Sequence, residues 1–112
     1  MTRYCLALDL VNDETLIAEY EAYHQKIWPE IKKSILEAGI EQMEIYRFAN
    51  RLFMIMEVNA EFNFANKSAA DAMNPKVQEW EALMWKYQQA MPGAKQEEKW
   101  VLMNKIFDLQ VN

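Results

Sequence analysis

Apolar and polar residues alternate over residues 4–10, where leucine takes every second position, and this period of two predicts a strand with one buried face. Over residues 17–35 the apolar positions instead recur at spacings of three and four, which predicts a helix with one inward face. Asp13 can cap the start of this helix, Pro29 should interrupt it because proline lacks a backbone N–H, and Gly39 is a suitable left-handed stop. The first part of the chain therefore predicts a strand and then a broken helix.

Two strand-like stretches follow, at residues 41–48 and 52–58, and the short link between them suits a hairpin. The second stretch is almost continuously apolar. Such a run is typical of a central strand that is covered on both faces. We therefore expect something other than solvent opposite the helices.

Residues 62–91 return to helical spacing, with Pro75 in the first turn of a second helical piece and Pro92 and Gly93 at the end. Residues 99–109 carry apolar side chains on both faces and predict a last strand that is buried twice. The order strand, helix, strand, strand, helix, strand is that of the ferredoxin-like βαββαβ arrangement. We therefore predict the α+β class, with an antiparallel sheet and two helices on one of its faces.

A sheet with two apolar faces and helices on only one of them leaves the other face uncovered. The ordinary solution is a second copy of the chain, so we predict a homodimer of the dimeric α/β barrel type. The 112 residues include only two glycines and three prolines, and no linker is visible. The sequence thus predicts a single domain over residues 1–112.

Charge and composition exclude several classes of partner. Lys and Arg number 12 against 17 Asp and Glu, giving a net charge of -5, so no basic surface for nucleic acid is expected. No apolar run is long enough to cross a membrane, and Asp9 falls where a signal peptide would continue its apolar stretch. The lone Cys5 lies in an apolar run and is expected to be a small buried hydrophobe in a reducing compartment. These features predict a cytoplasmic protein.

The chain has one histidine, His24, which lies on the inward stripe of the first helix one turn after Tyr20. Histidine can both take and give a proton near neutral pH, as acid/base catalysis requires. A single histidine on an apolar helical face is also compatible with a purely structural, hydrogen-bonded role. The residues alone leave both interpretations open.

Other chemistries lack the residues they need. One His and one Cys cannot supply the three or four ligands of a transition-metal site, and no glycine-rich loop is present to hold a nucleotide or flavin. Ser34, Ser68 and Cys5 have no second histidine or elbow motif to activate them as nucleophiles. We therefore expect no metal and no cofactor.

Aromatic residues are abundant and gather near the end of the second helix, beside two carboxylates: Trp80, Trp85, Tyr87, Glu79 and Glu81. Core packing explains most aromatic residues. Flat apolar side chains flanked by carboxylates are also how proteins bind sugars, since the apolar face packs on the ring while the acceptors take hydroxyl protons. Composition alone leaves both explanations open.

The segment at residues 20–30 reads Tyr-x-x-x-His and then Ile-Trp-Pro-Glu, and it resembles the first helix of the L-rhamnose mutarotase family. Met43-Glu-Ile-Tyr46, the Arg51-Leu-Phe-Met hairpin and Gln78-Glu-Trp80 also look like family features in the right order. The resemblance covers essentially the whole chain. It implies a cofactor-free isomerase that interconverts the α and β anomers of an L-6-deoxyhexose, either L-rhamnose or L-fucose.

Carried over by position, the resemblance implies that His24 is the proton donor and that Tyr20 lies against the bound sugar. It places Trp80 at the first of two adjacent family tryptophans that contact substrate. The second is Glu81 here, and Met43 stands where the best-known members have tyrosine. Both departures reduce the aromatic character of the site, and they look like features of an L-fucose-directed branch.

Two alternative functions remain open at this stage. One is a non-catalytic dimeric module whose cavity holds a small apolar or sugar ligand. The other is a cofactor-free oxygenase, because dimeric ferredoxin-like folds host that chemistry too, and fold by itself never fixes function. Neither alternative explains the His-Ile-Trp-Pro-Glu pattern as simply as the mutarotase hypothesis.

Overall fold

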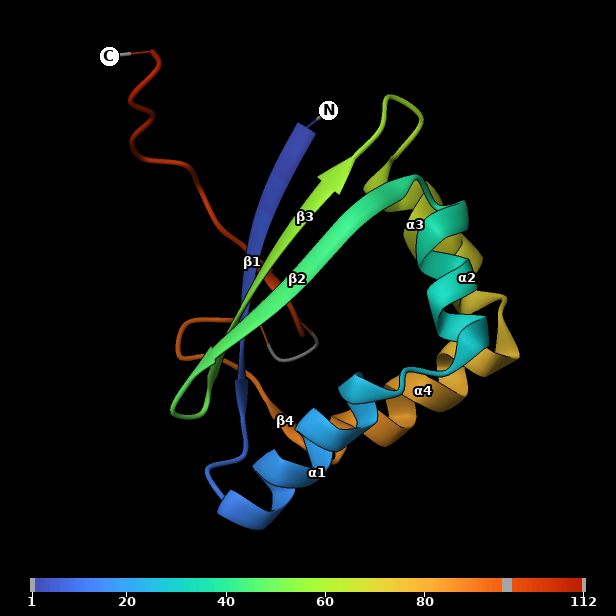
Figure 1. Ribbon diagram of the computed structural model, residues 1–112, viewed down its shortest axis with the longest axis vertical. Helices are drawn as coiled ribbons and strands as arrows, with labels where there is room; N and C mark the ends of the chain where they lie inside the picture. Colours follow the sequence, from blue (N-terminus) through green and yellow to red (C-terminus); the bar gives the residue numbers. More distant parts are fainter. Residues whose placement is uncertain (1, 96–97, 112) are drawn as a thin grey trace.

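Three long strands make up most of the sheet in the computed structural model, which describes residues 2–95 and 98–111. β1 (Thr2–Leu10), β2 (Ile40–Phe48) and β3 (Arg51–Val58) lie antiparallel in the order β2-β3-β1 (Figure 1). Two short strands, β4 (Gln88–Gln89) and β5 (Val101–Leu102), pair with the free edge of β1. The predicted α+β class with an antiparallel sheet is confirmed.

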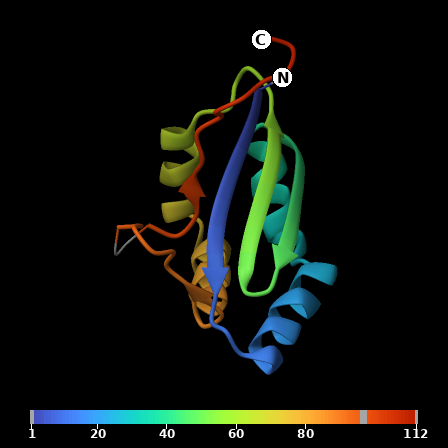
Figure 2. The same ribbon diagram turned by 90° about the vertical axis from the view of Figure 1, so that its left-hand side faces the viewer.

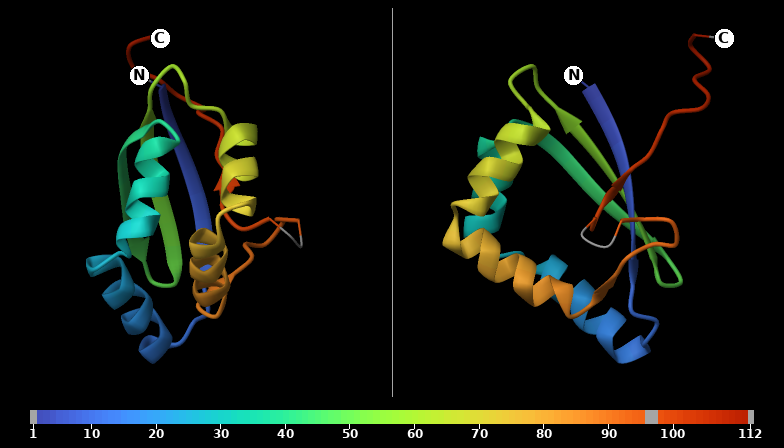
Figure 3. Two further views of the ribbon diagram at one scale, coloured as in Figure 1. Left: turned by 90° about the vertical axis from the view of Figure 1, so that its right-hand side faces the viewer. Right: turned by 180° about the vertical axis from the view of Figure 1, so that it is seen from behind.

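The helices all lie on one face of this sheet, as Figures 2 and 3 show from the two opposite sides. They are α1 (Glu14–Gln25), α2 (Pro29–Glu37), α3 (Phe64–Ala72) and α4 (Pro75–Trp85). Each of the two predicted helical stretches is thus divided into two pieces at a proline. No helix within the described ranges has both the length and the apolar character needed to cross a bilayer.

The local chemistry explains where the helices start. The Asp13 side chain accepts a hydrogen bond from the Leu16 backbone N–H at 3.0 Å and caps α1. The residue before Pro29 is extended, with φ −59° and ψ 135°, because the proline ring disfavours helical backbone there. Asn74 caps α4 in the same way as Asp13 caps α1, and Pro75 follows it at a position where no helical N–H is needed. The two breaks were therefore predictable from the sequence.

The core lies between the sheet and the helices. In the register of β1 and β3, Leu8 stands opposite Leu52 and Leu6 opposite Met54, and all four side chains are buried. Helix residues close this layer from the other side. The larger cluster comprises Leu10, Tyr20, Ile31, Leu52, Val77, Trp80, Met84 and Tyr87.

None of the helices formed by the described residues covers the opposite face of the sheet (Figure 2). Side chains on β3 that point to this face are only half-buried, among them Phe53 and Ile55. On β2, Tyr46 is 54% exposed and Phe48 is 85% exposed. Within one chain, the expectation that β3 is covered on both faces is therefore met on the helical face only.

Three expectations for the C-terminal part of the chain and for Cys5 were wrong. Helix α4 ends at Trp85 rather than near residue 91. The backbone N–H of Val11 donates a hydrogen bond to the Tyr87 carbonyl at 2.8 Å, and the chain continues from there into β4. The last strand spans only β5, and Ile106 is 95% exposed, so the segment is not buried twice. The apolar pattern of residues 99–109 indicates which side chains could be buried, but it does not identify the surface that would bury them. Cys5 is half-buried, because it points to the face that carries no helix.

Candidate active site

His24 lies in the last turn of α1, and its ring lines a cavity between the helices and the sheet. Its Nδ1 is 2.9 Å from the backbone carbonyl oxygen of Tyr20, one turn earlier. A carbonyl oxygen can only accept a hydrogen bond, so Nδ1 is the nitrogen that carries the proton. In the neutral ring, Nε2 then holds the lone pair. The helix thus fixes the imidazole in the tautomer that can take a proton at Nε2.

Burial controls the charge of both residues. It lowers the pKa of His24 below its ordinary value, and the hydrogen bond to the Tyr20 carbonyl acts in the opposite direction. Burial also raises the pKa of Tyr20 to about 12, against a hydrogen bond with Gln88 that lowers it. At neutral pH the imidazole is therefore uncharged and the phenol keeps its proton. The two rings lie with their centroids 4.3 Å apart, so a proton acceptor and a hydrogen-bond donor are side by side.

Trp80 forms an aromatic wall beside the imidazole. It reaches this place because Val77, Trp80 and Met84 follow helical spacing and face inward from α4. The centroid of Trp80 is 5.5 Å from that of His24 and 5.0 Å from that of Trp28, both with steeply inclined ring planes. With 8% of its surface exposed, Trp80 is fixed by its neighbours and still presents part of its ring to the cavity.

The cavity has a volume of about 330 Å³, within the usual range of roughly 300 to 1,000 Å³ for small-molecule sites. All of the site residues expected from the sequence line it: Tyr20, His24, Met43, Trp80 and Glu81. They come from three separate elements, α1, β2 and α4. The fold therefore brings the predicted residues together, while the role of each one stays a prediction.

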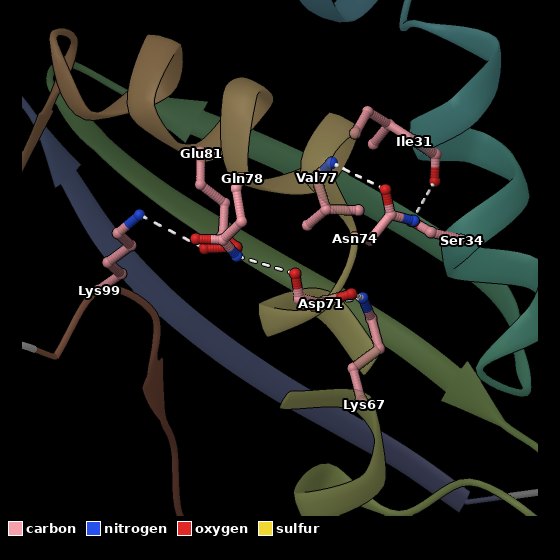
Figure 4. A network of polar contacts seen from close by, with 9 residues as sticks. All are labelled: Ile31, Ser34, Lys67, Asp71, Asn74, Val77, Gln78, Glu81 and Lys99. Carbon is pink, nitrogen blue, oxygen red and sulfur yellow. Dashed lines mark hydrogen bonds and ion pairs between the residues drawn. The ribbon is translucent and has the colours of Figure 1, made fainter. Parts of the chain in front are cut away.

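Charged side chains form a polar rim at one part of the cavity (Figure 4). Lys67 Nζ contacts the two carboxylate oxygens of Asp71 at 2.7 and 2.6 Å. The side-chain amide of Gln78 donates to the backbone carbonyl of Asp71 at 2.8 Å and so ties α4 to the end of α3. Glu81 lies 3.7 Å from Lys99 Nζ. These residues offer both acceptors and donors to the hydroxyl groups of a ligand.

Comparison with known proteins assigns the chain to a family. A family model described as L-rhamnose mutarotase matches residues 3–109. Over 111 residues the chain is 46% identical to the L-fucose mutarotase of Xanthomonas campestris pv. campestris, which covers 97% of this chain and 89% of that protein. This chain belongs to the L-rhamnose mutarotase family. It is therefore an isomerase that interconverts the anomers of a sugar.

One further relative bears a mutarotase name, and two solved structures share the fold. An L-rhamnose mutarotase of Phocaeicola vulgatus is 35% identical over 71 residues, which cover 62% of this chain and 61% of that protein. The solved structure of an L-rhamnose mutarotase from Formosa agariphila superposes with a TM-score of 0.72 at 20% identity, covering 97% of this chain and 99% of that one. Tetracenomycin F2 cyclase from Streptomyces glaucescens gives 0.63 at 16% identity, covering 96% and 98%. The two structural likenesses show the fold alone, which serves more than one chemistry.

The mutarotase cavity also contains polar residues that the sequence did not single out. They are Lys67, Asp71, Gln88 and Lys99. Gln88 fell inside the expected helix, where helical spacing gave no reason to direct it at His24. Lys67 and Asp71 form an (i,i+4) pair, which in a sequence is typical of an exposed helix face. No local pattern distinguished these four residues from ordinary surface residues.

Only one member of the aromatic group near the end of α4 belongs to the mutarotase cavity. Trp80 lines it, whereas Trp85 is 42% exposed and lies under Lys99, whose Nζ is 4.9 Å from the ring centroid. Tyr87 is buried in the core and its hydroxyl donates to Glu19 at 3.0 Å. Core packing thus explains Tyr87, and the sugar-binding hypothesis is restricted to Trp80 and Glu81.

Metal chemistry has no candidate centre in the part of the chain that the structure describes. Within residues 2–95 and 98–111, no three His, Cys, Asp or Glu side chains lie close enough together to hold an ion. Several groups at the cavity can exchange a proton: the imidazole of His24, the phenol of Tyr20, the carboxylates of Asp71 and Glu81, and the ammonium groups of Lys67 and Lys99. The chemistry open to the site is proton transfer to and from a bound hydroxyl or ring oxygen.

Proposed function

We propose that this mutarotase acts on an L-6-deoxyhexose, with L-fucose preferred over L-rhamnose, and that His24 carries the proton. The observation that carries the proposal is a neutral imidazole, with the lone pair on Nε2, at the wall of a cavity suited to a small molecule. The preference for L-fucose is supported by the 46% identity to an L-fucose mutarotase. Met43 and Glu81, which depart from the pattern of the best-known family members, are consistent with that choice.

Two proton transfers open the sugar ring. The proton of the anomeric hydroxyl moves to Nε2 of His24 while the bond between C1 and the ring oxygen breaks, its electrons pass to the ring oxygen, and that oxygen takes a proton. C1 is now an aldehyde carbon. Rotation about the C1–C2 bond turns its other face to the ring hydroxyl, and the reverse transfers close the ring as the other anomer. Acid/base help of about 10² to 10⁴ in rate suffices for a reaction that already occurs in water.

Tyr20 is the group that we assign to the ring oxygen. Its hydroxyl keeps its proton at neutral pH, since burial raises its pKa to about 12, and its ring lies against that of His24. Glu81 is less suited to this task because it is engaged by Lys99 at 3.7 Å. In ring opening His24 is then the proton acceptor and Tyr20 the donor. In ring closure the roles reverse, and His24 is the proton donor that the family resemblance implies.

Substrate recognition divides between apolar and polar parts of the cavity. Trp80 offers a flat surface for the apolar face of the sugar ring. Met43 lies opposite Met56 in the register of β2 and β3, and both side chains line the cavity, so they form a soft apolar surface for the methyl group of a 6-deoxy sugar. Glu81 can accept a hydrogen bond from a ring hydroxyl.

The experiment that tests the proposal measures anomer exchange of L-fucose and L-rhamnose by saturation-difference NMR. His24→Asn, confirmed as folded by circular dichroism, should lose about 10² to 10⁴ in kcat/KM because the proton acceptor is gone. Gln25→Asn is the matched control, since this neighbour in the same helix turn is exposed and does not line the cavity. Unchanged exchange in His24→Asn would reject the role of His24.

The same assay separates the mutarotase from a module that only binds sugar. A binding module would gain thermal stability with L-fucose without any faster exchange by the unsubstituted protein. A kcat/KM for L-rhamnose equal to or above that for L-fucose would contradict the proposed preference while leaving the reaction in place.

We also propose that two copies of the chain form a dimer through the sheet face that carries no helix. Large apolar side chains are exposed on this face, with Phe48 at 85% and Tyr46 at 54%. The C-terminal segment leaves the sheet on the same side (Figure 1), and Ile106 and Phe107 on it are 95% and 65% exposed. Large apolar side chains exposed on one side of a molecule are typical of a protein interface, and a two-fold axis would cover both copies at once.

A further inference from the structure

Gln88 is a polar residue that the fold directs into the active-site cavity. It is the first residue of β4 and stands opposite Leu10 in the pairing with β1. The neighbouring Tyr87 fixes the backbone further, because its N–H donates to the Met84 carbonyl at 2.9 Å and its carbonyl accepts from Val11 at 2.8 Å. The side chain of Gln88 lines the same cavity as His24 and Tyr20. Its position is therefore built by the sheet and not by a mobile loop.

The two ends of the Gln88 amide are in different situations. A hydrogen bond with Gln88 lowers the pKa of Tyr20, which is the effect of an N–H that donates to the phenolic oxygen. The amide oxygen, Oε1, is buried and has no hydrogen-bond partner within the part of the chain that the structure describes. A buried acceptor that stays unpaired costs free energy, and native proteins contain few such groups. A ligand that donates to Oε1 would remove this cost.

We propose that Gln88 is a substrate-binding residue whose Oε1 accepts a hydrogen bond from a ring hydroxyl of the sugar, while its N–H group holds the phenolic oxygen of Tyr20. An amide oxygen can only accept, so its partner must be a donor, and a sugar presents hydroxyl donors around its ring. With its oxygen engaged by Gln88, the Tyr20 hydroxyl is free to direct its own proton at the ring oxygen. Gln88 thus orients both the sugar and the proposed acid. This inference rests on the proposed roles of His24 and Tyr20 and on the proposed sugar substrate.

The test is the substitution Gln88→Met, which keeps the length of the side chain and removes both polar ends. We expect KM for L-fucose to rise about tenfold, the value of one neutral hydrogen bond. The melting temperature of the sugar-free protein should change little, because the substitution removes an unpaired buried acceptor together with the hydrogen bond to Tyr20. Gln89→Met is the matched control, since Gln89 is the adjacent residue of the same strand and is exposed, and it should leave KM unchanged.

Deoxy analogues of L-fucose identify the hydroxyl that Gln88 binds. One analogue should lower kcat/KM of the unsubstituted protein, though by less than Gln88→Met loses with L-fucose, because the substitution also releases Tyr20. Gln88→Met should lose nothing more with that analogue. An unchanged KM in Gln88→Met would overturn the role of Gln88 while mutarotation itself stands. A lowered melting temperature with equal losses for all analogues would also overturn it, because that result describes a structural residue. No exchange by the unsubstituted protein would remove the basis of both proposals.

Discussion

At the scale of the residue, the chemistry depends on how burial changes the pKa values of His24 and Tyr20. The sequence places a histidine one helical turn after a tyrosine, and this spacing by itself brings the Nδ1 of His24 within 2.9 Å of the Tyr20 carbonyl. The direction in which each pKa moves depends on Trp80 and other residues far away in the chain. The tautomer is therefore a local property, whereas the charge state is a property of the fold.

The pKa of His24 can be measured directly because it is the only histidine. We expect its NMR titration in the folded protein to give a value below 6.5, and in urea a value near 6.5. Because protonation removes the lone pair on Nε2, kcat/KM should fall as the pH drops through the lower of these values. The stability contributed by neutral His24 is complete above 6.5 and is lost as the pH falls through the folded pKa. A folded value above 6.5 would contradict the assignment.

Trp80 should affect binding more than turnover. Trp80→Phe keeps an aromatic ring in the core but shrinks the surface offered to the sugar, so KM should rise several-fold with little change in kcat. Trp85→Phe is the control, since this tryptophan is 42% exposed and lies outside the cavity. Equal kinetic effects of the two substitutions, measured by the exchange assay, would show that Trp80 does not contact the substrate.

At the scale of the element, proline and glycine decided the boundaries that the sequence predicted well. The breaks at Pro29 and before Pro75 are where the pattern placed them, because the missing N–H and the restricted residue before proline act locally. Gly39 has φ +97°, a conformation in which a residue with a Cβ is strained. The end of α4 was mispredicted, because apolar spacing continues past Trp85 while the backbone leaves the helix to pair with β1.

Gly39→Ala should destabilise the protein by about 2 kcal/mol or more, from backbone strain and from close contact. A Cβ at Gly39 would lie 2.5 Å from Oδ1 of Asn59, whose backbone N–H donates to the Gly39 carbonyl at 2.9 Å. Gly93→Ala is the matched comparison, since Gly93 has φ +87° but no atom of residues 2–95 and 98–111 lies within 4 Å of the new Cβ. Urea unfolding should give the larger loss for Gly39→Ala, and equal losses would exclude a contribution from the contact.

At the scale of the whole molecule, the helices of one chain cover one face of the sheet and leave the other face open. If a second copy covers it, Phe48→Asp and Ile106→Asp should each shift the protein in analytical ultracentrifugation from twice the 13.3 kDa chain mass towards the single chain. A charge buried without a partner at an interface opposes association. Met73→Asp is the control, because Met73 is 86% exposed but lies at the end of α3, on the helical side of the sheet. A monomeric unsubstituted protein would contradict the dimer outright.

The sequence by itself determined the order and type of the elements as far as α4, the positions of the helix breaks and the apposition of His24 with Tyr20. Each of these follows from interactions within a few residues, such as a period of two or four, a capping side chain or a proline ring. The five predicted site residues, which line one cavity, were also named from the sequence, but through a resemblance to a family and not through their spacing. Local pattern alone left His24 open to a structural interpretation.

The tertiary structure decided the rest. Only packing brings Gln88, Lys67 and Lys99 to the cavity of His24, because these residues come from segments far apart in the chain and carry no local signal of their own. Only packing buries His24 and Tyr20 enough to move their pKa values apart. The last strand ends at Leu102 because its pairing with β1 ends there, although the apolar pattern continues beyond it. A local pattern limits which surfaces can be buried, whereas the partner that buries them is chosen by contacts between distant parts of the chain.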